Sequence, residues 1–585
     1  MPADGFYGLI KRLGPAQHIV KPDVLSSRTS SPDETHDAMF GPVTHGSAIC
    51  HCEDGRWVVF LGELYNHDDL RSTLAIHDDT TLARLLFIAF ERWMDDCIVR
   101  LDGQFVLAAC DGDRLYLYRD ISGRHSLFYT NPNQNTFAFA SQVDPLFHLT
   151  RVERRLNRRA LHEYLHLLEI AAPNTLFAGI HALEPGQLLT WSADTINLSR
   201  PTIDRVPEAP SYEEALVELD SLLQHSVKTR LHDASTPAAF LSGGVDSSLL
   251  CALAARVAPT VTAVTVGFDE PRLDETSIAQ AVAMHLGVRH NVLRFTYQEF
   301  LQALRDFADS AEQPMADPAI APTVLTFDYC RTHYDVVLDG SGADEAFGAM
   351  PPRHVRIAVQ YAALLPYRLR QVCVRLLQRT PRLGGYAPIF NFEHPAEMML
   401  RWNGFTRAEI ETLCEEPVDF AHTLFYRTFA RFPRHAHFER YSALLDAMTC
   451  DRLYHAASIT GLTVRYPYWD RRVDAFVRSL PLDYRYRPTQ PKRLLRGLLA
   501  RYVPPELWDV PKHGFDFPLQ VFLAAEDFYL VRRYLLRADW KRWQVVSAEA
   551  VAVYAQRFMA GEHALTFRVW ALVVLAAWLE SHCWL

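Results

Sequence analysis

One short segment combines the residue types that bind phosphate groups. An apolar stretch at 238–241 runs into two glycines, an aspartate and three serines, and a second apolar stretch follows. The glycines allow a tight turn and close approach of the backbone to a ligand, and free N–H groups at a helix start attract an anion. The serine hydroxyls can donate to phosphate oxygens, and the aspartate can hold Mg²⁺ against them. The residues of this loop are Ser242, Gly243, Gly244, Val245, Asp246, Ser247 and Ser248.

Two interpretations of this loop differ in specificity. The glycines alone are typical of a turn capped by serine, which needs no ligand. The complete sequence Ser-Gly-Gly-Val-Asp-Ser-Ser after an apolar strand is far more specific and indicates a nucleotide phosphate site. It is neither of the two common nucleotide loops, because the lysine of GxxxxGK[ST] and the glycine spacing of GxGxxG are both missing.

The elements around the loop alternate as in an α/β unit. Ser211-Tyr-Glu-Glu214 has the pattern of a capping box and predicts a helix that continues to about Leu231. A strand over 238–241, a helix over 247–257 and a strand over 260–268 follow. This alternation predicts a parallel sheet, and the rest of the chain has a mostly helical pattern.

The first 200 residues follow a different pattern. Short apolar runs at 56–62, 105–109 and 114–118 lie between Asp-Gly pairs, which are strong turn signals, and one helix is predicted over 80–93. The pattern predicts a β-rich first domain. We place the boundary in the proline-containing stretch near residue 205, which gives domains 1–205 and 206–585.

The composition excludes several classes of protein. The 585 residues are 49% hydrophobic and 22% charged, which is ordinary for a globular protein, so disordered, collagen-like and low-complexity chains are excluded. A net charge of −10 argues against nucleic acid as the main partner. The ten cysteines include no CxxC pair and the histidines show no HExxH spacing, so we expect reduced thiols and no histidine metal site.

Neither export nor membrane attachment is predicted. The N-terminus lacks the long apolar region of a signal peptide, and the apolar run at 569–579 is too short to span a bilayer, so it predicts a buried C-terminal helix. We therefore expect a cytoplasmic protein that binds no membrane. Lysine is scarce, with six among the 59 lysines and arginines, so a lysine within a motif is unusually informative.

The loop and a series of further motifs resemble the asparagine synthetase family. The loop looks like the pyrophosphate loop of ATP pyrophosphatases, which cleave ATP between the α and β phosphates and adenylate a substrate. Similar motifs occur in the family's order through both halves and cover nearly the whole chain. The principal ones are Gly62-Glu-Leu-Tyr-Asn-His67, Leu101-Asp-Gly-Gln-Phe105, Glu312-Gln-Pro-Met-Ala-Asp-Pro318, Leu338-Asp-Gly-Ser-Gly-Ala-Asp-Glu345, Val464-Arg-Tyr-Pro-Tyr-Trp-Asp470, Lys492-Arg-Leu-Leu-Arg496 and Pro511-Lys-His-Gly-Phe-Asp-Phe-Pro518.

The resemblance implies a fold class and two ligands. The fold class is α/β, with an N-terminal Ntn-hydrolase-like αββα sandwich that lacks the cysteine nucleophile. A C-terminal ATP pyrophosphatase domain of the adenine nucleotide α-hydrolase type follows, with a parallel sheet and a largely helical remainder. The implied ligands are ATP and Mg²⁺. Leu241, Val266 and Gly340 are expected to line the adenine and ribose site, although strand core is the alternative for the first two.

The resemblance also assigns roles to charged residues. Lys512 matches the family lysine that stabilises charge at the α-phosphate and at the tetrahedral intermediate, and Lys492 matches the lysine that holds the ATP phosphates. Asp246 and Asp344 match the ligands of a Mg²⁺ ion that bridges the β and γ phosphates. The alternatives are a solvated surface lysine for Lys512 and a helix cap for Asp344.

The first half departs from the family at its nucleophile. The family's glutaminase uses a cysteine at the mature N-terminus, whose thiol attacks glutamine and whose amine acts as the base. Here Met1 is followed by Pro2, and the first cysteine is Cys50. Without that nucleophile we expect no glutaminase activity, and we expect the domain to serve as a scaffold or binding surface. Asn66, which matches a residue of the family's oxyanion hole, is then a structural remnant.

The second half departs from the family at two residues expected near the amine acceptor. Asparagine synthetases carry glutamates where this chain has Ser341 and Thr463, whereas the ATP and Mg²⁺ residues are retained. Carboxylate activation is therefore expected to persist with a different amine acceptor. β-Lactam synthetases and lasso peptide cyclases have this profile, because both let an amine of the same molecule attack the adenylated carboxylate. The tyrosine and glutamate that β-lactam synthetases use at these two positions are absent, which favours the lasso peptide cyclases.

The expected activity is thus ATP-dependent closure of a macrolactam between an Asp or Glu side chain and the N-terminal amine of a peptide. A β-lactam synthetase, an ammonia-using asparagine synthetase and a non-catalytic scaffold remain as alternatives, and the intact loop, Asp344 and Lys512 argue against the last. The implied partners are a ribosomal precursor or core peptide, a leader peptidase and a leader-binding protein. Residues 346–392 contain seven arginines and no acidic residue, which indicates either a surface for an acidic peptide or partner or a solvated basic face.

Overall fold

The computed structural model describes most of the chain. The described residues are 5–12, 17–19, 23–25, 49–133, 136–192, 195–201, 210–268, 270, 274–379, 383–400, 404–448, 452–510 and 517–582.

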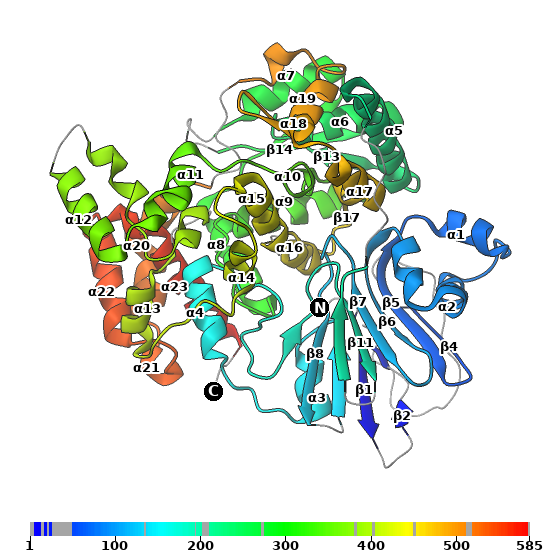
Figure 1. Cartoon of the computed structure of the whole chain (residues 1–585), viewed down its shortest axis with the longest axis horizontal. Coiled ribbons are helices and arrows are strands. Elements are labelled where there is room, and N and C mark those ends of the chain that lie inside the picture. Colours follow the sequence, from blue (N-terminus) through cyan, green and yellow to red (C-terminus); the bar gives the residue numbers. More distant parts are fainter. Residues whose placement is uncertain are drawn as a thin grey trace.

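Two antiparallel sheets form the N-terminal part of the molecule (Figure 1). One has the strand order β10-β8-β9-β1-β2, with β3 paired to β1, and the other has the order β12-β11-β7-β6-β5-β4. The strands are β1 (Gly5–Arg12), β2 (Gln17–Ile19), β3 (Asp23–Leu25), β4 (Ile49–Glu53), β5 (Arg56–Leu64), β6 (Gly103–Cys110), β7 (Leu115–Arg119), β8 (Phe128–Asn133), β9 (Thr136–Ala140), β10 (His181–Ala182), β11 (Leu188–Ser192) and β12 (Thr195–Ser199).

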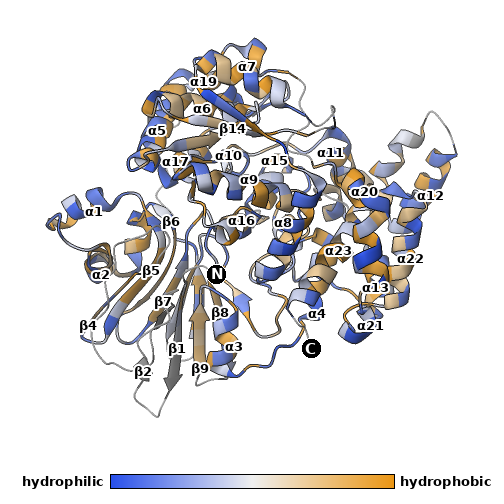
Figure 2. Ribbon diagram, turned by 180° about the vertical axis from the view of Figure 1, so that it is seen from behind, coloured by the Kyte–Doolittle hydropathy of each residue, from blue (hydrophilic) through white to orange (hydrophobic). Residues whose placement is uncertain are grey.

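Alternating side chains of β5 explain how these sheets stack. Trp57 and Val59 pack against Phe139 of the other sheet, whereas Val58 and Phe60 pack on the opposite face against α2 (Leu82–Trp93). Helix α3 (Asp144–Thr150) covers the outer face of the first sheet. The structure therefore confirms the predicted αββα sandwich. In Figure 2 the hydropathy follows this arrangement: the buried strand β9 is hydrophobic, whereas the outlying helix α1 (His67–Leu74) is largely hydrophilic.

A five-stranded parallel sheet forms the second part, in the order β15-β14-β13-β16-β17. Alternate residues again face opposite sides: Ala238 joins the core with α8 and α9, whereas Ala239 joins the core with α5 and α6. The parallel sheet of the prediction is confirmed. The elements are α5 (Tyr212–Leu231), β13 (Pro237–Phe240), α6 (Val245–Val257), β14 (Thr262–Val266), α7 (Thr276–Leu286), β15 (Arg289–Leu293), α8 (Tyr297–Ser310), α9 (Ile320–His333), β16 (Val336–Leu338) and β17 (Val464–Arg465).

The capping box at the start of α5 is formed as predicted. Ser211 Oγ accepts a hydrogen bond from the backbone N–H of Glu214 at 3.3 Å, and the Glu214 carboxylate accepts one from the backbone N–H of Ser211 at 2.8 Å. Two N–H groups that a helix start leaves unpaired are thereby satisfied.

The apolar C-terminal helix α23 (Thr566–Ser581) lies inside the largest core. Together with the short turn before it, it is long and apolar enough to cross a membrane by length and composition alone. Residues 569–579 are nevertheless each at most 3% exposed, because they pack within the protein. The structure thus confirms the predicted buried C-terminal helix.

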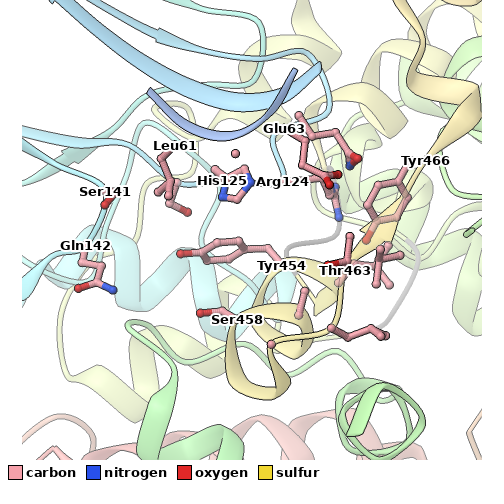
Figure 3. A pocket seen from close by; sticks show the side chains of 18 residues that line it. Leu61, Glu63, Arg124, His125, Ser141, Gln142, Tyr454, Ser458, Thr463 and Tyr466 are labelled. Atoms are coloured by element: carbon pink, nitrogen blue, oxygen red, sulfur yellow. The ribbon is translucent and has the colours of Figure 1, made fainter. Parts of the chain in front are cut away.

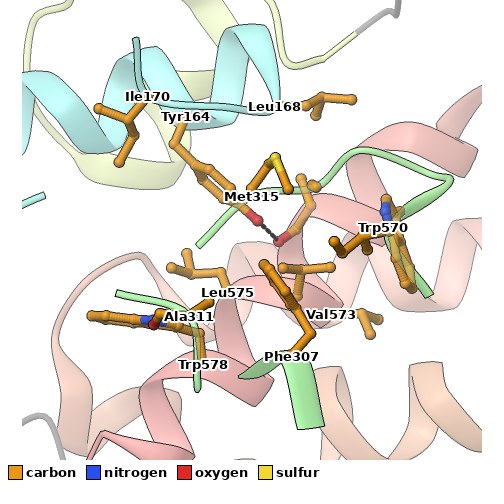
Figure 4. Packing of buried hydrophobic residues seen from close by; sticks show 14 of the residues in the cluster. Tyr164, Leu168, Ile170, Phe307, Ala311, Met315, Trp570, Val573, Leu575 and Trp578 are labelled. Carbon is orange, nitrogen blue, oxygen red and sulfur yellow. Dashed lines mark hydrogen bonds between the residues drawn. The ribbon is translucent and has the colours of Figure 1, made fainter. Parts of the chain in front are cut away.

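Helix α4 (Arg158–Leu167) belongs to the first 205 residues but packs into this C-terminal core (Figure 4). Tyr164 Oη donates a hydrogen bond to the carbonyl of Ala571 at 2.7 Å, as the dashed line in Figure 4 shows. Further along α23, Trp578 Nε1 donates to the carbonyl of Ala311 at 2.7 Å. These contacts satisfy two polar groups inside an otherwise apolar core.

Charged residues join the sandwich to the parallel sheet. The buried guanidinium of Arg465 in β17 donates to both carboxylate oxygens of Glu63 in β5, at 2.7 to 3.1 Å, and to Asp233 at 2.6 Å. Arg471 donates to the carbonyl of Ile98 and to Tyr118 Oη, each at 2.7 Å. The carboxyl edge of the parallel sheet is thereby held against the edge of the sandwich.

Candidate nucleotide site and the cavity beside it

The phosphate loop forms the turn between β13 and α6. Gly243 has a φ of +77°, and a Cβ atom at this position would lie 2.7 Å from Cγ2 of Ile278, so only glycine fits. Ser247 Oγ accepts a hydrogen bond from the backbone N–H of Ser242 at 3.1 Å and lies 3.1 Å from Ser242 Oγ. Both hydroxyls therefore lie at the positively polarised start of α6.

A cavity of about 400 Å³, here called the nucleotide cavity, opens beside this loop. Residues at or just beyond the last positions of β13, β14 and β16 line it, so it lies at the carboxyl edge of the sheet, where α/β folds bind their ligands. Its size suits a nucleotide. The predicted residues that line it are Leu241, Ser242, Gly244, Asp246, Ser247, Val266, Gly340 and Asp344.

Two predicted loop residues do not line this cavity. Gly243 forms the back of the turn against α7. Ser248 is fully buried, and its hydroxyl has no hydrogen-bond partner among the described residues. Successive side chains on a helix point about 100° apart, so Ser247 faces the cavity and Ser248 faces the core. Lys512 lies outside the described residues, so its predicted role stays a prediction.

Lys492 connects the two predicted metal ligands. It begins α19 (Arg493–Leu499) with a left-handed backbone, and its Nζ lies 2.5 Å from Asp246 Oδ2 and 2.7 Å from Asp344 Oδ1. Burial would lower the pKa of Lys492, but the two carboxylates outweigh burial and raise the pKa above its ordinary value. The lysine is therefore a permanent cation between the loops after β13 and β16.

The donor set fits Mg²⁺ bound with a nucleotide. Mg²⁺ takes oxygen ligands and is usually held by one or two carboxylates together with substrate phosphates and water. Asp246 and Asp344 supply two such carboxylates on one side of the cavity. Among the described residues no group of three or more His, Cys, Asp or Glu side chains could hold a metal ion. Any Mg²⁺ at these two residues would therefore need phosphate or water oxygens as further ligands.

Several residues of the nucleotide cavity escaped the sequence analysis. Thr323 and Thr326 line it from α9, whose apolar sequence gives no sign of a site. Arg452 lines it as well and lies 3.1 Å from the buried Asp317, which stands in a motif that the resemblance includes. Phe240 stacks on Phe327 with ring centroids 5.6 Å apart and forms an apolar wall.

The two residues that replace family glutamates lie in different cavities. Ser341 lines the nucleotide cavity, and its backbone N–H donates to Asp339 Oδ1 at 2.7 Å. Thr463, just before β17, lines a second cavity of about 180 Å³ between the sandwich and the parallel sheet. We call it the interdomain cavity. Figure 3 shows Glu63, Arg124 and His125 of the sandwich on one side, with residues of α16 (Arg452–Thr460) and the β17 region on the other.

Asn66, which is predicted to be a structural remnant, has contacts within the fold. Asn66 Nδ2 donates to the carbonyl of Arg100 at 2.8 Å, and Asn66 Oδ1 accepts from the backbone N–H of Asp102 at 2.9 Å. Both ends of this amide are thus used within the fold. Cys50 lies on β4 at the edge of its sheet, and no cysteine is among the described residues that line the interdomain cavity.

The arginine-rich segment 346–392 divides into one structural arginine and a set of accessible ones. Arg370 is buried and donates to the carbonyls of Leu365, Phe392 and Glu393 at 2.8 to 2.9 Å. The arginines at 353, 368, 375 and 379 are exposed, and three of them lie on or beside α12 (Tyr367–Gln378). The function of this basic face stays a prediction.

Comparisons with known proteins agree with this geometry. The model of the asparagine synthase family matches residues 218–580, and a model of a glutamine amidotransferase domain matches residues 43–201. A Mycobacterium bovis protein, provisionally named a glutamine-hydrolysing asparagine synthetase, is 28% identical over 548 residues, which are 89% of this chain and 84% of that protein. Asparagine synthetase 1 (glutamine-hydrolysing) of Bacillus subtilis is 24% identical over 565 residues, which are 91% of this chain and 87% of that one.

The synthase model alone spans more than half of the chain, and it includes the phosphate loop, both aspartates and Lys492. The protein therefore belongs to the asparagine synthase family and is an ATP-dependent, amide-forming ligase with an N-terminal glutamine amidotransferase domain.

Proposed function

We propose that this protein is an ATP-dependent lasso peptide macrocyclase. It adenylates an Asp or Glu side chain of a leader-cleaved core peptide and joins that carboxylate to the N-terminal amine of the same peptide. The products are a macrolactam, AMP and pyrophosphate. The observation that carries this proposal is the retention of the nucleotide loop beside the loss of both acceptor-side glutamates, at Ser341 and Thr463.

The chemistry proceeds in two displacements. A carboxylate oxygen of the peptide attacks the α-phosphorus of ATP, and pyrophosphate leaves with the electrons of the broken P–O bond. The N-terminal amine then attacks the acyl carbon, a C–N bond forms, AMP leaves, and the amine loses a proton. Lys492 and Lys512 supply positive charge to the phosphates and to the developing oxyanion. Mg²⁺, when bound, would neutralise charge on the pyrophosphate leaving group.

The same proposal includes the loss of glutamine hydrolysis. A glutaminase of this type needs a thiol nucleophile beside its base. The described cysteines lie on the edge strand β4, on helix α12 or in cores, and none of them lines the interdomain cavity. We expect incubation with glutamine to release no more glutamate than heat-denatured protein releases. A measurable turnover of glutamine by the purified protein would contradict this part of the proposal.

A second candidate is asparagine synthesis with free ammonia, because the relatives of Mycobacterium bovis and Bacillus subtilis carry the name asparagine synthetase. It would use the same adenylation but a small acceptor. Ser341 and Thr463 stand where the family has glutamates, and this exchange favours an acceptor other than ammonia.

The proposed function implies partners and a location. The substrate is a ribosomal precursor peptide after removal of its leader, so a leader peptidase and a leader-binding protein would act before this enzyme. Because ATP is an intracellular co-substrate, we propose that the protein works in the cytoplasm.

One assay separates the candidates. The protein would be given ATP, Mg²⁺ and synthetic peptides that have a free N-terminal amine and a single Asp or Glu, placed at each internal position in turn. We expect pyrophosphate release and a product lighter than the peptide by one water in mass spectrometry. Aspartate with ammonia should release no pyrophosphate. If only aspartate with ammonia is turned over, the macrocyclase proposal is wrong.

A further inference from the structure

The interdomain cavity lies directly beside the nucleotide cavity. Leu453, in the first turn of α16, lines both. Leu61 and Gly62 of β5 and His125 of the sandwich form one wall, and Tyr454 and Ser458 of α16 form the other (Figure 3). A group bound here would therefore be separated from the nucleotide by a single helical turn.

Four polar side chains in this cavity are available to a ligand. No hydrogen bond within the described part of the chain reaches the imidazole of His125 or the hydroxyls of Ser126, Ser458 and Thr463. Polar groups that face a cavity and have no protein partner can bond to water or to a ligand there, so these side chains indicate where a polar guest would bind.

The other polar groups of the cavity already have partners inside the protein. Glu63 is held by Arg465 and by Tyr65 Oη, and Gln104 accepts a hydrogen bond from the same Tyr65 hydroxyl. Ser141 Oγ accepts from the backbone N–H of Phe6 at 2.9 Å. Arg465 thus balances the charge of Glu63, the single carboxylate among the described residues that line the cavity.

The available groups are therefore neutral ones. Burial lowers the pKa of His125 to about 4, so at pH 7 its ring offers one N–H donor and one nitrogen acceptor. Arg124 in the same wall stacks on Tyr466 and Trp469, and its positive charge disfavours a metal ion or a protonated amine. The neutral donors and acceptors beside it suit an uncharged amine and its adjoining amide.

We propose that the interdomain cavity is the subsite for the terminal residue that carries the attacking amine. This inference rests on the macrocyclase function proposed above. The amine and first amide of the peptide bond to His125, Ser458 and Thr463, and the terminal side chain packs against Leu61 and Ala457. The subsite meets the nucleotide cavity at Leu453, so a terminal residue bound with its amine at this boundary presents the amine to the adenylated carboxylate. A cavity of about 180 Å³ admits one residue of a peptide.

Filling the cavity tests the inference. Ser458→Trp would occupy it, and Thr463→Val would remove one hydroxyl at constant volume. Each variant receives a peptide that the wild-type protein cyclises, and two products are measured: the macrolactam, and the hydroxamate that forms when added hydroxylamine intercepts the adenylate. Hydroxylamine is small and does not need the subsite. The matched control is Ser479→Trp, which fills a different cavity of about 420 Å³ between the same two parts of the protein.

We expect macrolactam formation to fall at least tenfold in Ser458→Trp and at least threefold in Thr463→Val, with hydroxamate formation within twofold of wild type in both. The control should retain both products. Macrolactam formation at the wild-type rate in Ser458→Trp overturns the inference, and so does a parallel fall of both products in Thr463→Val. If Ser458→Trp does not fold, Thr463→Val decides alone. A wild-type protein that forms hydroxamate but never macrolactam refutes the proposed function instead.

Discussion

Lys492, which the resemblance assigns to the ATP phosphates, also joins the two predicted metal ligands, and its motif does not show that contact. Its ammonium group lies within 2.7 Å of one carboxylate oxygen of Asp246 and one of Asp344, so the three residues form one charged unit at the nucleotide cavity. A cation that already neutralises two carboxylates lets them approach triphosphate without strong repulsion. Lys512 follows a different motif, and the resemblance links it to the reacting α-phosphate rather than to the bound triphosphate.

Replacing each lysine by alanine should therefore impair a different property: ATP binding for Lys492 and product formation for Lys512. Lys492→Ala should raise the KM for ATP at least tenfold, since it removes a ground-state contact worth about 1.4 kcal/mol or more. Lys512→Ala should leave ATP binding nearly intact and lower product formation over a hundredfold, which corresponds to about 3 kcal/mol of transition-state stabilisation. Pyrophosphate release and ATP titration, measured together, check both effects.

Lys541→Ala serves as the control, because that side chain is 78% exposed and pairs only with an exposed carboxylate among the described residues. Lys512→Arg should not restore the rate, because the planar guanidinium cannot place a compact charge at the same point. If Lys512→Ala loses ATP affinity in step with its rate, the assigned role is wrong.

At the scale of elements, the β13–α6 turn depends on a glycine that cannot be replaced. Gly243→Ala would force an alanine to φ +77° and bring its Cβ into Ile278 of α7. We expect a cost of about 1–3 kcal/mol and a displaced loop, seen as at least a tenfold weaker affinity for ATP. Gly287→Ala separates backbone strain from the steric clash. Gly287 also has a positive φ, of +68°, but a Cβ atom there would have open space around it. Equal losses of affinity in both variants would refute the steric explanation.

Helix α4 contains a carboxyl group that titrates far from its usual range. Burial raises the pKa of Glu163 to about 8, although the Asn174 side-chain amide donates to it at 2.6 Å. In the unfolded chain this group loses its proton near pH 4.5, whereas in the folded protein it keeps the proton until about pH 8. The native state therefore binds more protons within that window, and Glu163 lowers stability progressively as the pH rises.

Glu163→Gln should remove this pH dependence. Its melting temperature should equal that of the wild type near pH 4.5 and exceed it at pH 8, because the wild type loses up to about 1.4 kcal/mol per pH unit between these values. Differential scanning calorimetry at the two pH values measures the difference. A melting difference that is the same at both would show that Glu163 does not titrate in this window.

At the scale of the whole molecule, Arg465 joins the sandwich to the parallel sheet. Its side chain is 3% exposed and bonds to Glu63 on one part and Asp233 on the other. Arg465→Met should destabilise the protein by about 2–3 kcal/mol, since it leaves two half-buried carboxylates without a counter-charge. Thermal unfolding should show a lower midpoint, and limited proteolysis should cut more readily between the two parts. The exposed pair of Arg557 and Glu562 offers the contrast, because Arg557→Ala should change stability by no more than about 0.5 kcal/mol.

The sequence alone determined the local architecture. The short apolar runs of β5 and β6, the Asp-Gly turns, the capping box of Ser211 and Glu214, and the glycine loop before α6 each depend on a few neighbouring residues, so consecutive positions are enough to predict them. The resemblance extended this to the αββα sandwich, the parallel sheet and most of the residues that line the nucleotide cavity. Ser248 shows the limit, because its direction depends on which face of α6 packs against the core.

Only the tertiary structure decided which distant residues meet. Lys492 reaches Asp246 across 246 positions of the chain, α4 enters the C-terminal core, and Ser341 and Thr463 line separate cavities although both replace acceptor-side glutamates. The interdomain cavity exists because five segments of the chain converge, at 61–63, 104, 124–126, 141–142 and 453–466. Such contacts depend on packing and ion pairing across the whole fold, so no short stretch of the sequence is enough to predict them.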